Sequence, residues 1–209
     1  MTGVASLNQQ AFVERLCNFG VWSKDTSEAL ALAVDVHRDQ RRAGGGPYLE
    51  EHVFPVTIAA VDYISHVKPD EAKSTALVAI MHDAVEDSSP STAEVIVERF
   101  GESIAGAVSI LTKPGKSQGE SSESNSEDEA RYVAGVAGAA HFIRVIKVFD
   151  RLNNLASLHE RTPEQRRKYL AETRAYYLEI ARSVDASLAG QMAELVTMQE
   201  TSLDSRSAS

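Results

Sequence analysis

The amino-acid sequence predicts an all-α fold in a single compact domain. Apolar residues recur at helical spacing through nearly the whole chain, and no stretch shows the sustained alternation and β-branched enrichment that a β-strand requires. The chain has 209 residues, of which 43% are hydrophobic. That length and composition provide for one sizeable core, so we expect a bundle of helices that folds as one unit.

Glycine, proline and polar clusters divide this periodic sequence into a series of predicted helices. They cover residues 8–19, 26–42, 51–66, 70–88, 92–100, 102–112, 127–140, 142–159 and 163–200. Gly101 resembles a C-terminal stop, which separates the two helices on either side of it. Pro163 lies at the expected start of the last helix, because proline is tolerated in the first turn.

Two stretches interrupt the helical pattern. The first, AGGGPY at 43–48, is rich in glycine; the second, at 114–129, is rich in Ser, Gly and acidic residues, so we expect a mobile loop there. The predicted organisation is an N-terminal helix within residues 1–25, a main domain over residues 26–200 and a frayed tail at 201–209.

The charge balance limits the partners of the protein. Thirty Asp and Glu residues against 21 Lys and Arg residues give a formal net charge of −9. That sign is wrong for a protein that coats nucleic acid or an anionic membrane. The single Cys17 cannot form an internal disulfide, and neither a signal peptide nor a membrane-spanning stretch is recognisable. We therefore expect a cytoplasmic protein with no nucleic-acid and no membrane partner.

The stretch MHDAVEDSS at 81–89 crowds like charges together. On a helix at about 100° per residue, four of its side chains would share one face: His82, Asp83, Glu86 and Asp87. A solvated polar face is the alternative, but such a face usually mixes acidic residues with Lys and Arg, and residues 74–98 contain neither. Because clustered carboxylates repel one another, the composition favours a bound cation.

A second polar stripe lies in RVIKVFDRLNNLASL at 144–158. Four of its side chains follow the spacing i, i+3, i+4 and i+7 of one helix face: Asp150, Asn153, Asn154 and Ser157. A surface helix could show the same pattern. Together with the HD pair upstream and with His52, the stripe completes a set of two imidazoles and two carboxylates. Such a set suits a divalent transition metal.

Six motifs follow one another over roughly residues 26–181. They are HRDQRRAGGGPY, His52, HDAVED, FG at 100–101, LTKP at 111–114 and IKVFDRLNNLASL. In this order and spacing they resemble the hydrolase domain of the RelA/SpoT family of alarmone enzymes, within the HD phosphohydrolase superfamily. The letters HD alone are a weak signal, whereas the ordered set is specific. The resemblance implies an HD-type helical bundle.

The resemblance also implies a metal site and a reaction. One divalent ion, usually Mn²⁺, would be held by His52, His82, Asp83 and Asp150. Glu86 and Asp87 would handle the attacking water. The substrate would be guanosine tetra- or pentaphosphate, (p)ppGpp, whose 3′-pyrophosphate is removed to leave GDP or GTP.

The substrate contacts are predicted from the same resemblance and from residue chemistry. They comprise Arg42, Tyr48, Lys113, Arg151, Asn154 and Ser157. Arg42 would meet the guanine or the phosphates, because a guanidinium can stack on a base or fork onto phosphate. Asn154 and Ser157 would meet the ribose or the base.

The chain departs from the family pattern in three respects. It has one extra residue between Tyr48 and His52, and Val53 stands in place of proline. Phe149 and Asn153 stand where the family has alanine and histidine, changes that could reshape the pocket. Nothing after the hydrolase-like segment is long enough for a synthetase domain, so the chain resembles a small, hydrolase-only member that could form a homo-oligomer.

Two other functions stay open at the level of sequence. One keeps the metal chemistry but acts on another nucleotide, such as the 2′-phosphate of NADPH or a pyrimidine nucleotide, and the changes at Phe149 and Asn153 would support it. The other is a non-catalytic nucleotide-binding protein on an HD fold. A missing ligand or a broken Glu-Asp pair would indicate the latter, and the sequence has neither defect.

Overall fold

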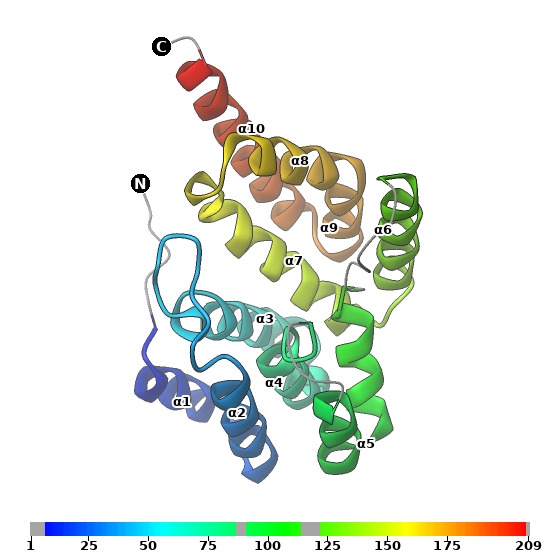
Figure 1. Cartoon of the computed structure of the whole chain (residues 1–209). Coiled ribbons are helices and arrows are strands. Elements are labelled where there is room, and N and C mark those ends of the chain that lie inside the picture. The colour runs from blue at the N-terminus through cyan, green and yellow to red at the C-terminus, as the bar shows by residue number, and fades with distance from the viewer. Residues whose placement is uncertain (1–6, 87–90, 114–121, 208–209) are drawn as a thin grey trace.

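The structure is a computed structural model that describes residues 7–86, 91–113 and 122–207 (Figure 1). The α-helices are α1 (Gln9–Asn18), α2 (Lys24–Val36), α3 (Phe54–Val67), α4 (Ala72–Met81), α5 (Ser91–Leu111), α6 (Ser122–Ala137), α7 (His141–Ala156), α8 (Pro163–Glu172), α9 (Leu178–Val184) and α10 (Ala186–Ser207). Short π-helical turns span Leu49–Val53 and Thr173–Tyr177, and 3-10 turns span Pro69–Glu71 and Leu158–Glu160. Within the described ranges, the only β-type pairing is an isolated bridge between Arg41 and Pro47. The predicted all-α class is confirmed.

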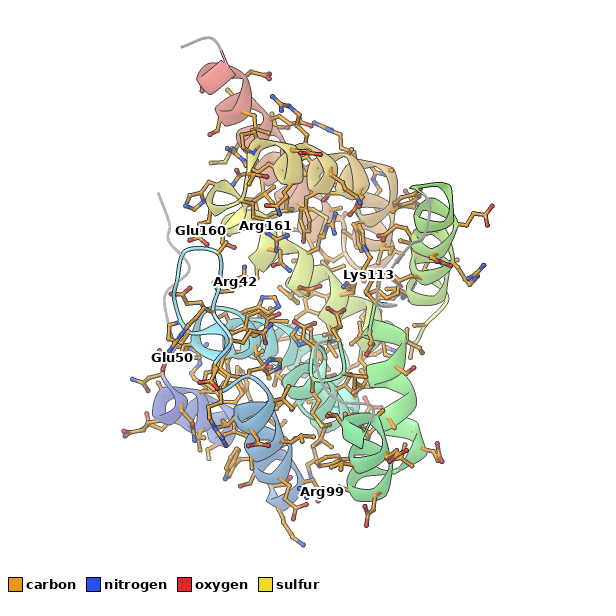
Figure 2. All side chains as sticks on the ribbon, viewed as in Figure 1. Arg42, Glu50, Arg99, Lys113, Glu160 and Arg161 are labelled. Atoms are coloured by element: carbon orange, nitrogen blue, oxygen red, sulfur yellow. The ribbon has the colours of Figure 1, made fainter. Side chains whose placement is uncertain are left out.

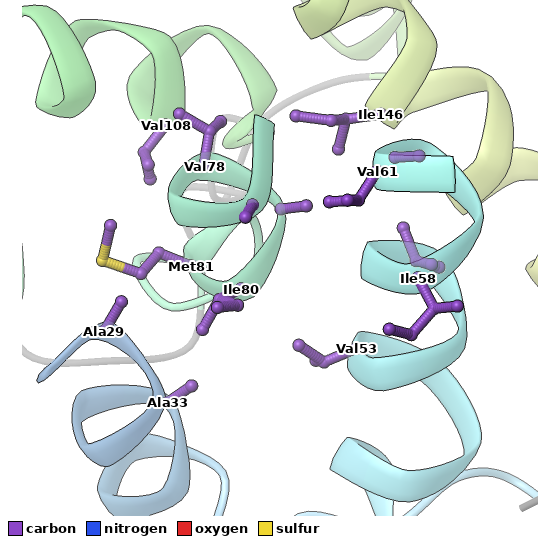
Figure 3. Close-up of a cluster of buried hydrophobic side chains, with 14 of the residues drawn as sticks. Ala29, Ala33, Val53, Ile58, Val61, Val78, Ile80, Met81, Val108 and Ile146 are labelled. Atoms are coloured by element: carbon purple, nitrogen blue, oxygen red, sulfur yellow. The ribbon is translucent and has the colours of Figure 1, made fainter. Parts of the chain in front are cut away.

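Helix α7 joins two groups of packed helices. Its first half contributes Ile143, Val145 and Ile146 to a core shared with α1 to α5. From Val148 onward, α7 contributes Val148 and Leu155 to a core shared with α6 and α8 to α10. Figure 1 shows α7 running between these two groups, and Figure 3 shows apolar side chains of α2, α3, α4, α5 and α7 converging in the first core. Polar residues on α7 therefore lie at the centre of the molecule.

The N-terminal helix belongs to the first core. Phe12 and Leu16 are fully buried, and the Phe12 ring stacks on Phe54 with 4.2 Å between ring centroids. The Asn8 side chain caps α1 by accepting a hydrogen bond from the backbone N–H of Ala11. Helix α1 is thus held to the start of α3, close to the π turn that carries His52.

Two predicted helices end earlier than expected. Helix α2 stops at Val36, and the following segment turns back through Gly45, whose φ of +91° favours glycine. Helix α4 stops at Met81 rather than at residue 88. Beyond it, the N–H of Ala84 bonds to Met81 O and the N–H of Glu86 to Asp83 O, so turn hydrogen bonds replace helical ones. The prediction that His82, Asp83 and Glu86 share a helix face is wrong, because they lie in these turns.

The predicted break at Gly101 is confirmed. Gly101 adopts φ +81° and ψ 164° inside α5, a backbone conformation that only glycine adopts readily. The helix is therefore kinked there into two segments. The single long helix predicted over 163–200 is wrong. It begins at Pro163 as expected, with Thr162 and Gln165 forming a capping box, but a π turn and a break at Asp185 divide it.

The remaining differences concern two segments outside the main helices. Part of the predicted loop over 114–129 lies outside the described residues, and the part from Ser122 onward is the start of α6. Helix α10 continues to Ser207, through most of the tail for which fraying was predicted. No helix in the described part of the chain combines the length and apolar character needed to cross a bilayer.

Candidate metal centre and active site

Four side chains from three separate elements converge between α3, α4 and α7. His52 comes from the π turn before α3, His82 and Asp83 from the turn after α4, and Asp150 from the middle of α7. His52, His82 and Asp150 are almost completely buried, with exposed fractions of 1%, 2% and 5%. The four predicted metal ligands are therefore brought together in a site shielded from solvent.

The distances are those of a compact ligand set. The Nε2 atoms of His52 and His82 are 3.3 Å apart, and Asp83 Oδ2 lies 3.1 Å from the first and 3.2 Å from the second. The ligand atoms of these three residues all lie within 4.8 Å of one another. Asp150 Oδ1 lies 3.4 Å from His52 Nε2. One small cation could contact all three donors, and the Asp150 carboxylate lies beside them.

The extra residue before His52 is absorbed by the π turn. In this turn the N–H of Phe54 bonds to Leu49 O, five residues back, so the turn holds one residue more than an α-helical turn would. Tyr48, on the other side of the insertion, donates its hydroxyl hydrogen to Asp83 Oδ2 at 2.5 Å. The insertion thus leaves both Tyr48 and His52 directed at Asp83.

The electrostatics show that this site attracts positive charge. Burial lowers the pKa of His82, but the neighbouring Asp83 and Asp150 carboxylates outweigh it and raise the pKa to about 9. Burial raises the pKa of Asp83, yet the charge of His82 and hydrogen bonds from both imidazoles hold it well below its ordinary value. The carboxylates thus favour positive charge on His82, and a metal cation would interact with the same carboxylates.

Asp150 also forms an ion pair with a lysine. Lys147, one turn earlier on α7, places its Nζ 2.8 Å from Asp150 Oδ2, and both side chains are buried. Burial would lower the pKa of Lys147, but Asp150 raises it well above its ordinary value. The pairing holds the second carboxylate oxygen while Oδ1 faces His52. Their i, i+3 spacing is the sequence signal that could have identified this pair.

Glu86 lies at the edge of the cluster. Its carboxylate accepts a hydrogen bond from the backbone N–H of Lys113 at 2.8 Å, although the residue as a whole is exposed. Loss of water around this carboxylate, with the negative charge of Asp83, raises its pKa to about 7. A carboxylate of that pKa can exchange protons near neutral pH. Asp87, predicted to act with it, lies outside the described residues.

Four predicted substrate-binding residues belong to one network. Arg42 donates to Asn154 Oδ1 at 2.9 Å and to Ser157 Oγ at 2.5 Å, across more than 100 residues of sequence. Asn154 in turn donates through Nδ2 to Asp150 Oδ1 at 2.6 Å. The fourth, Tyr48, lies 5.9 Å from the Arg42 guanidinium carbon. Arg42 is therefore held beside the metal cluster by the polar stripe of α7.

Arg151 does not join this network, and its prediction as a substrate contact needs correction. Its guanidinium lies between the rings of Tyr169 and Tyr177, 3.5 Å and 4.0 Å from their centroids. It also donates to Thr173 Oγ1 and to Tyr169 O, and the residue is 4% exposed. Arg151 is one position beyond Asp150, so it leaves α7 about 100° around the helix and faces the second core.

Lys113 is directed to α6. Its ammonium group forms an ion pair with Glu129, a buried residue that also accepts a hydrogen bond from Tyr177. Figure 2 shows Lys113 near α6, and Arg42 close to the loop that precedes the π turn. The Lys113 ammonium group is thus engaged by α6, while its backbone N–H bonds to Glu86 at the edge of the cluster; its contact with a substrate stays a prediction.

The two substitutions in α7 have different surroundings. Phe149 packs against both cores and meets Tyr63 edge-on, with 6.1 Å between ring centroids. Phe149 therefore takes part in the packing between the two cores. Asn153 does lie at the site, where its Oδ1 is 2.7 Å from His52 Nδ1. The sequence marked it as a departure but did not identify this partner.

A helical frame with two imidazoles and two carboxylates at its centre defines the class of HD-type metal sites. A family model described as "HD domain" matches residues 29–186, and the chain belongs to this family. An HD domain implies a divalent metal, which the His-His-Asp cluster is suited to hold.

Curated relatives indicate which HD-domain enzymes the chain resembles. A probable guanosine-3′,5′-bis(diphosphate) 3′-pyrophosphohydrolase of Synechocystis is 34% identical over 154 residues, 73% of this chain and 19% of that protein. The enzyme of the same name from Aquifex aeolicus is 30% identical over 166 residues, 79% of this chain and 22% of that protein. The chain thus spans about a fifth of the length of these curated relatives. The resemblance to the RelA/SpoT hydrolase domain is confirmed.

A solved structure supports the fold. It is described as a metazoan ortholog of SpoT that hydrolyses ppGpp, and it superimposes with a TM-score of 0.66 at 24% sequence identity. The match covers 85% of this chain and 97% of that one. At this identity, the likeness establishes a common arrangement of helices.

Proposed function

We propose that the protein is a metal-dependent hydrolase that removes the 3′-pyrophosphate of guanosine tetra- or pentaphosphate, giving GDP or GTP and pyrophosphate. The observation that carries the proposal is the network from Arg42 through Asn154 and Asp150 to His52, because it joins an anion-binding group to a metal site. The names of the relatives supply the substrate class.

The proposed metal is Mn²⁺, bound by His52, His82, Asp83 and Asp150. Mixed imidazole and carboxylate ligands suit a borderline ion better than an all-oxygen site would, which supports Mn²⁺ over Mg²⁺. When bound, such an ion polarises a phosphoryl oxygen and lowers the pKa of a water molecule.

The residues of the chain have distinct tasks in this proposal. Glu86 accepts the proton of the attacking water, since its pKa of about 7 is suited to proton exchange near neutral pH, and Asp87 is proposed to assist it. Arg42 binds the substrate phosphates or the guanine, with Asn154 and Ser157 completing that side of the pocket. Tyr48 orients Asp83 through its hydroxyl group.

The alternative functions have less support than the proposed one. Of the two changes that would favour another nucleotide, Phe149 contacts Tyr63 and the two cores, and only Asn153 contacts a candidate metal ligand. The complete ligand set and the position of Glu86 argue against a purely binding protein. The net charge of −9 supports a small-molecule substrate over nucleic acid or an anionic membrane. A cytoplasmic location and a homo-oligomer stay predictions.

Turnover on a panel of nucleotides tests the proposal. The purified protein, stripped of metal and reloaded with Mn²⁺, should convert guanosine tetraphosphate to GDP and intact pyrophosphate. Asp83→Ala should abolish the reaction and bound metal, whereas Asp204→Ala, at an exposed position on α10, should leave both unchanged. Release of orthophosphate alone, or faster release of the 2′-phosphate from NADPH, would contradict the proposed substrate.

A further inference from the structure

We propose that Asn153 is a positioning residue of the metal centre, which holds the His52 ring with Nε2 directed at the metal ligands. The inference rests on the metal site of the proposed function and adds a residue that does not itself bind metal or substrate. It also explains how this chain keeps the site intact with an extra residue before His52 and without the histidine usual at position 153.

The orientation of the Asn153 amide follows from its two contacts. One end lies 3.2 Å from the backbone oxygen of Glu51, which can only accept a hydrogen bond, so the Nδ2 group must face it. The Oδ1 atom therefore faces His52 Nδ1 at 2.7 Å, and this nitrogen must carry a hydrogen. The other ring nitrogen, Nε2, is thereby kept for the ion and points at Asp83 and His82.

His82 is oriented by the same logic with a different partner. Its Nδ1 lies 2.8 Å from Ala79 O, an atom that again can only accept. A backbone carbonyl of α4 thus fixes the second imidazole, whereas the first depends on a side chain from α7. Groups that bind the far nitrogen of a ligating histidine set its tautomer and its ring orientation.

The second contact of Asn153 compensates for a gap in the backbone hydrogen bonds. In an α-helix the Glu51 carbonyl would accept from the N–H four residues later, but that residue is Pro55, which has none. Asn153 supplies a donor in its place. One amide therefore ties both the π turn and the His52 ring to α7.

Burial makes this arrangement difficult to replace. His52 is 1% exposed, so water cannot easily take over the role of acceptor for its Nδ1 hydrogen if the amide is lost. The ring would then be free to turn or to change tautomer. A turn of the ring would move Nε2 away from its place 3.1 Å from Asp83 Oδ2, and a change of tautomer would put the ring hydrogen on Nε2, where it would block metal binding.

Two variants separate positioning of His52 from simple support of the turn. Asn153→Leu removes both hydrogen bonds at similar volume, and Asn153→Asp keeps an acceptor for His52 but loses the donor for Glu51. The matched control is Asn18→Leu, at the exposed last residue of α1. Metal affinity is measured by calorimetric titration with Mn²⁺ and Zn²⁺, and the fold is checked by circular dichroism and thermal midpoint.

Asn153→Leu should bind metal roughly 10–100-fold more weakly than wild type, the range found for partners of metal ligands. Asn153→Asp should stay much closer to wild type, and Asn18→Leu should equal it. Affinity within twofold of wild type in a folded Asn153→Leu, or equal losses in both Asn153 variants, would overturn the inference. On guanosine tetraphosphate, kcat at saturating metal should fall more than KM rises in Asn153→Leu.

A further measurement covers the case in which Asn153→Leu fails to fold. In the Zn²⁺-loaded wild type, ¹⁵N NMR of the histidine rings should show hydrogen on Nδ1 of His52 and metal on Nε2. The opposite assignment would refute the role of Asn153 without any variant. These readouts need no nucleotide, so a protein that binds metal in this way but leaves guanosine tetraphosphate intact would refute the proposed function and not this inference.

Discussion

The buried pair of Lys147 and Asp150 provides a quantitative test of how the site is stabilised. Lys147→Met replaces the ammonium group by an apolar side chain of similar length and leaves the Asp150 carboxylate without its cation. Removing one partner of a buried ion pair costs about 3–5 kcal/mol, because the remaining charge stays buried and uncompensated. At about 2–4 °C per kcal/mol for a chain of this size, the thermal midpoint should fall by roughly 6–20 °C.

The pH dependence of this loss follows from the pKa of Asp150. Burial raises that pKa, but the positive charges of Lys147 and His52 lower it by more. In the wild type the pKa of Asp150 therefore lies below its ordinary value of 3.8. A carboxyl group whose pKa is lower in the folded than in the unfolded protein stabilises the fold at any pH above its unfolded-state pKa. That stabilisation is lost as the pH falls through the folded-state pKa. In Lys147→Met the pKa of Asp150 should rise, so the deficit should be largest at neutral pH and shrink in acid.

Thermal and urea unfolding of the metal-free protein measure this effect. Lys147→Met is compared with Asp150→Asn and with the double variant, in which neither charge remains. The double variant should be more stable than Lys147→Met, since it leaves no unpaired charge. Added Mn²⁺ should raise the midpoint of Lys147→Met more than that of wild type, because the ion can pair with Asp150. A midpoint drop below about 2 °C, or a double variant no more stable than Lys147→Met, would refute the reasoning.

Three further predictions concern catalysis, Arg151 and the core. Glu86→Gln should keep bound metal and the fold but lower kcat by roughly 10²–10⁴, as measured by metal analysis and single-turnover kinetics; a rate within a few fold of wild type would remove Glu86 from the chemistry. Arg151→Lys should lower the free energy of unfolding by about 2–3 kcal/mol without changing KM, because Lys cannot fill the space between Tyr169 and Tyr177. A raised KM at unchanged stability would show instead that Arg151 contacts the substrate. Phe12→Ala should cost about 3–5 kcal/mol in urea unfolding, and a loss under 1 kcal/mol would mean that α1 is not part of the first core.

The sequence alone predicted the fold class and the candidate metal ligands. Apolar periodicity marked most helices, Gly101 and Pro163 marked a break and a start, and these are signals between residues close in the chain. The HD pair, His52 and Asp150 were identified by residue type and order, and the structure brings them together. Arg42, Asn154 and Ser157 were each predicted as substrate contacts by resemblance, and the structure places all three in one hydrogen-bond network.

Only the tertiary structure decided how each of these side chains is oriented. Helix α4 ends at Met81 and turn hydrogen bonds follow it, which the helical pattern of the sequence did not indicate. Arg151 faces the second core, where it lies between the rings of Tyr169 and Tyr177. The pairing of His52 with Asn153 joins groups 101 positions apart in sequence. Local periodicity and capping depend on neighbours within about one helical turn, whereas the partner of a buried polar group depends on which elements pack around it.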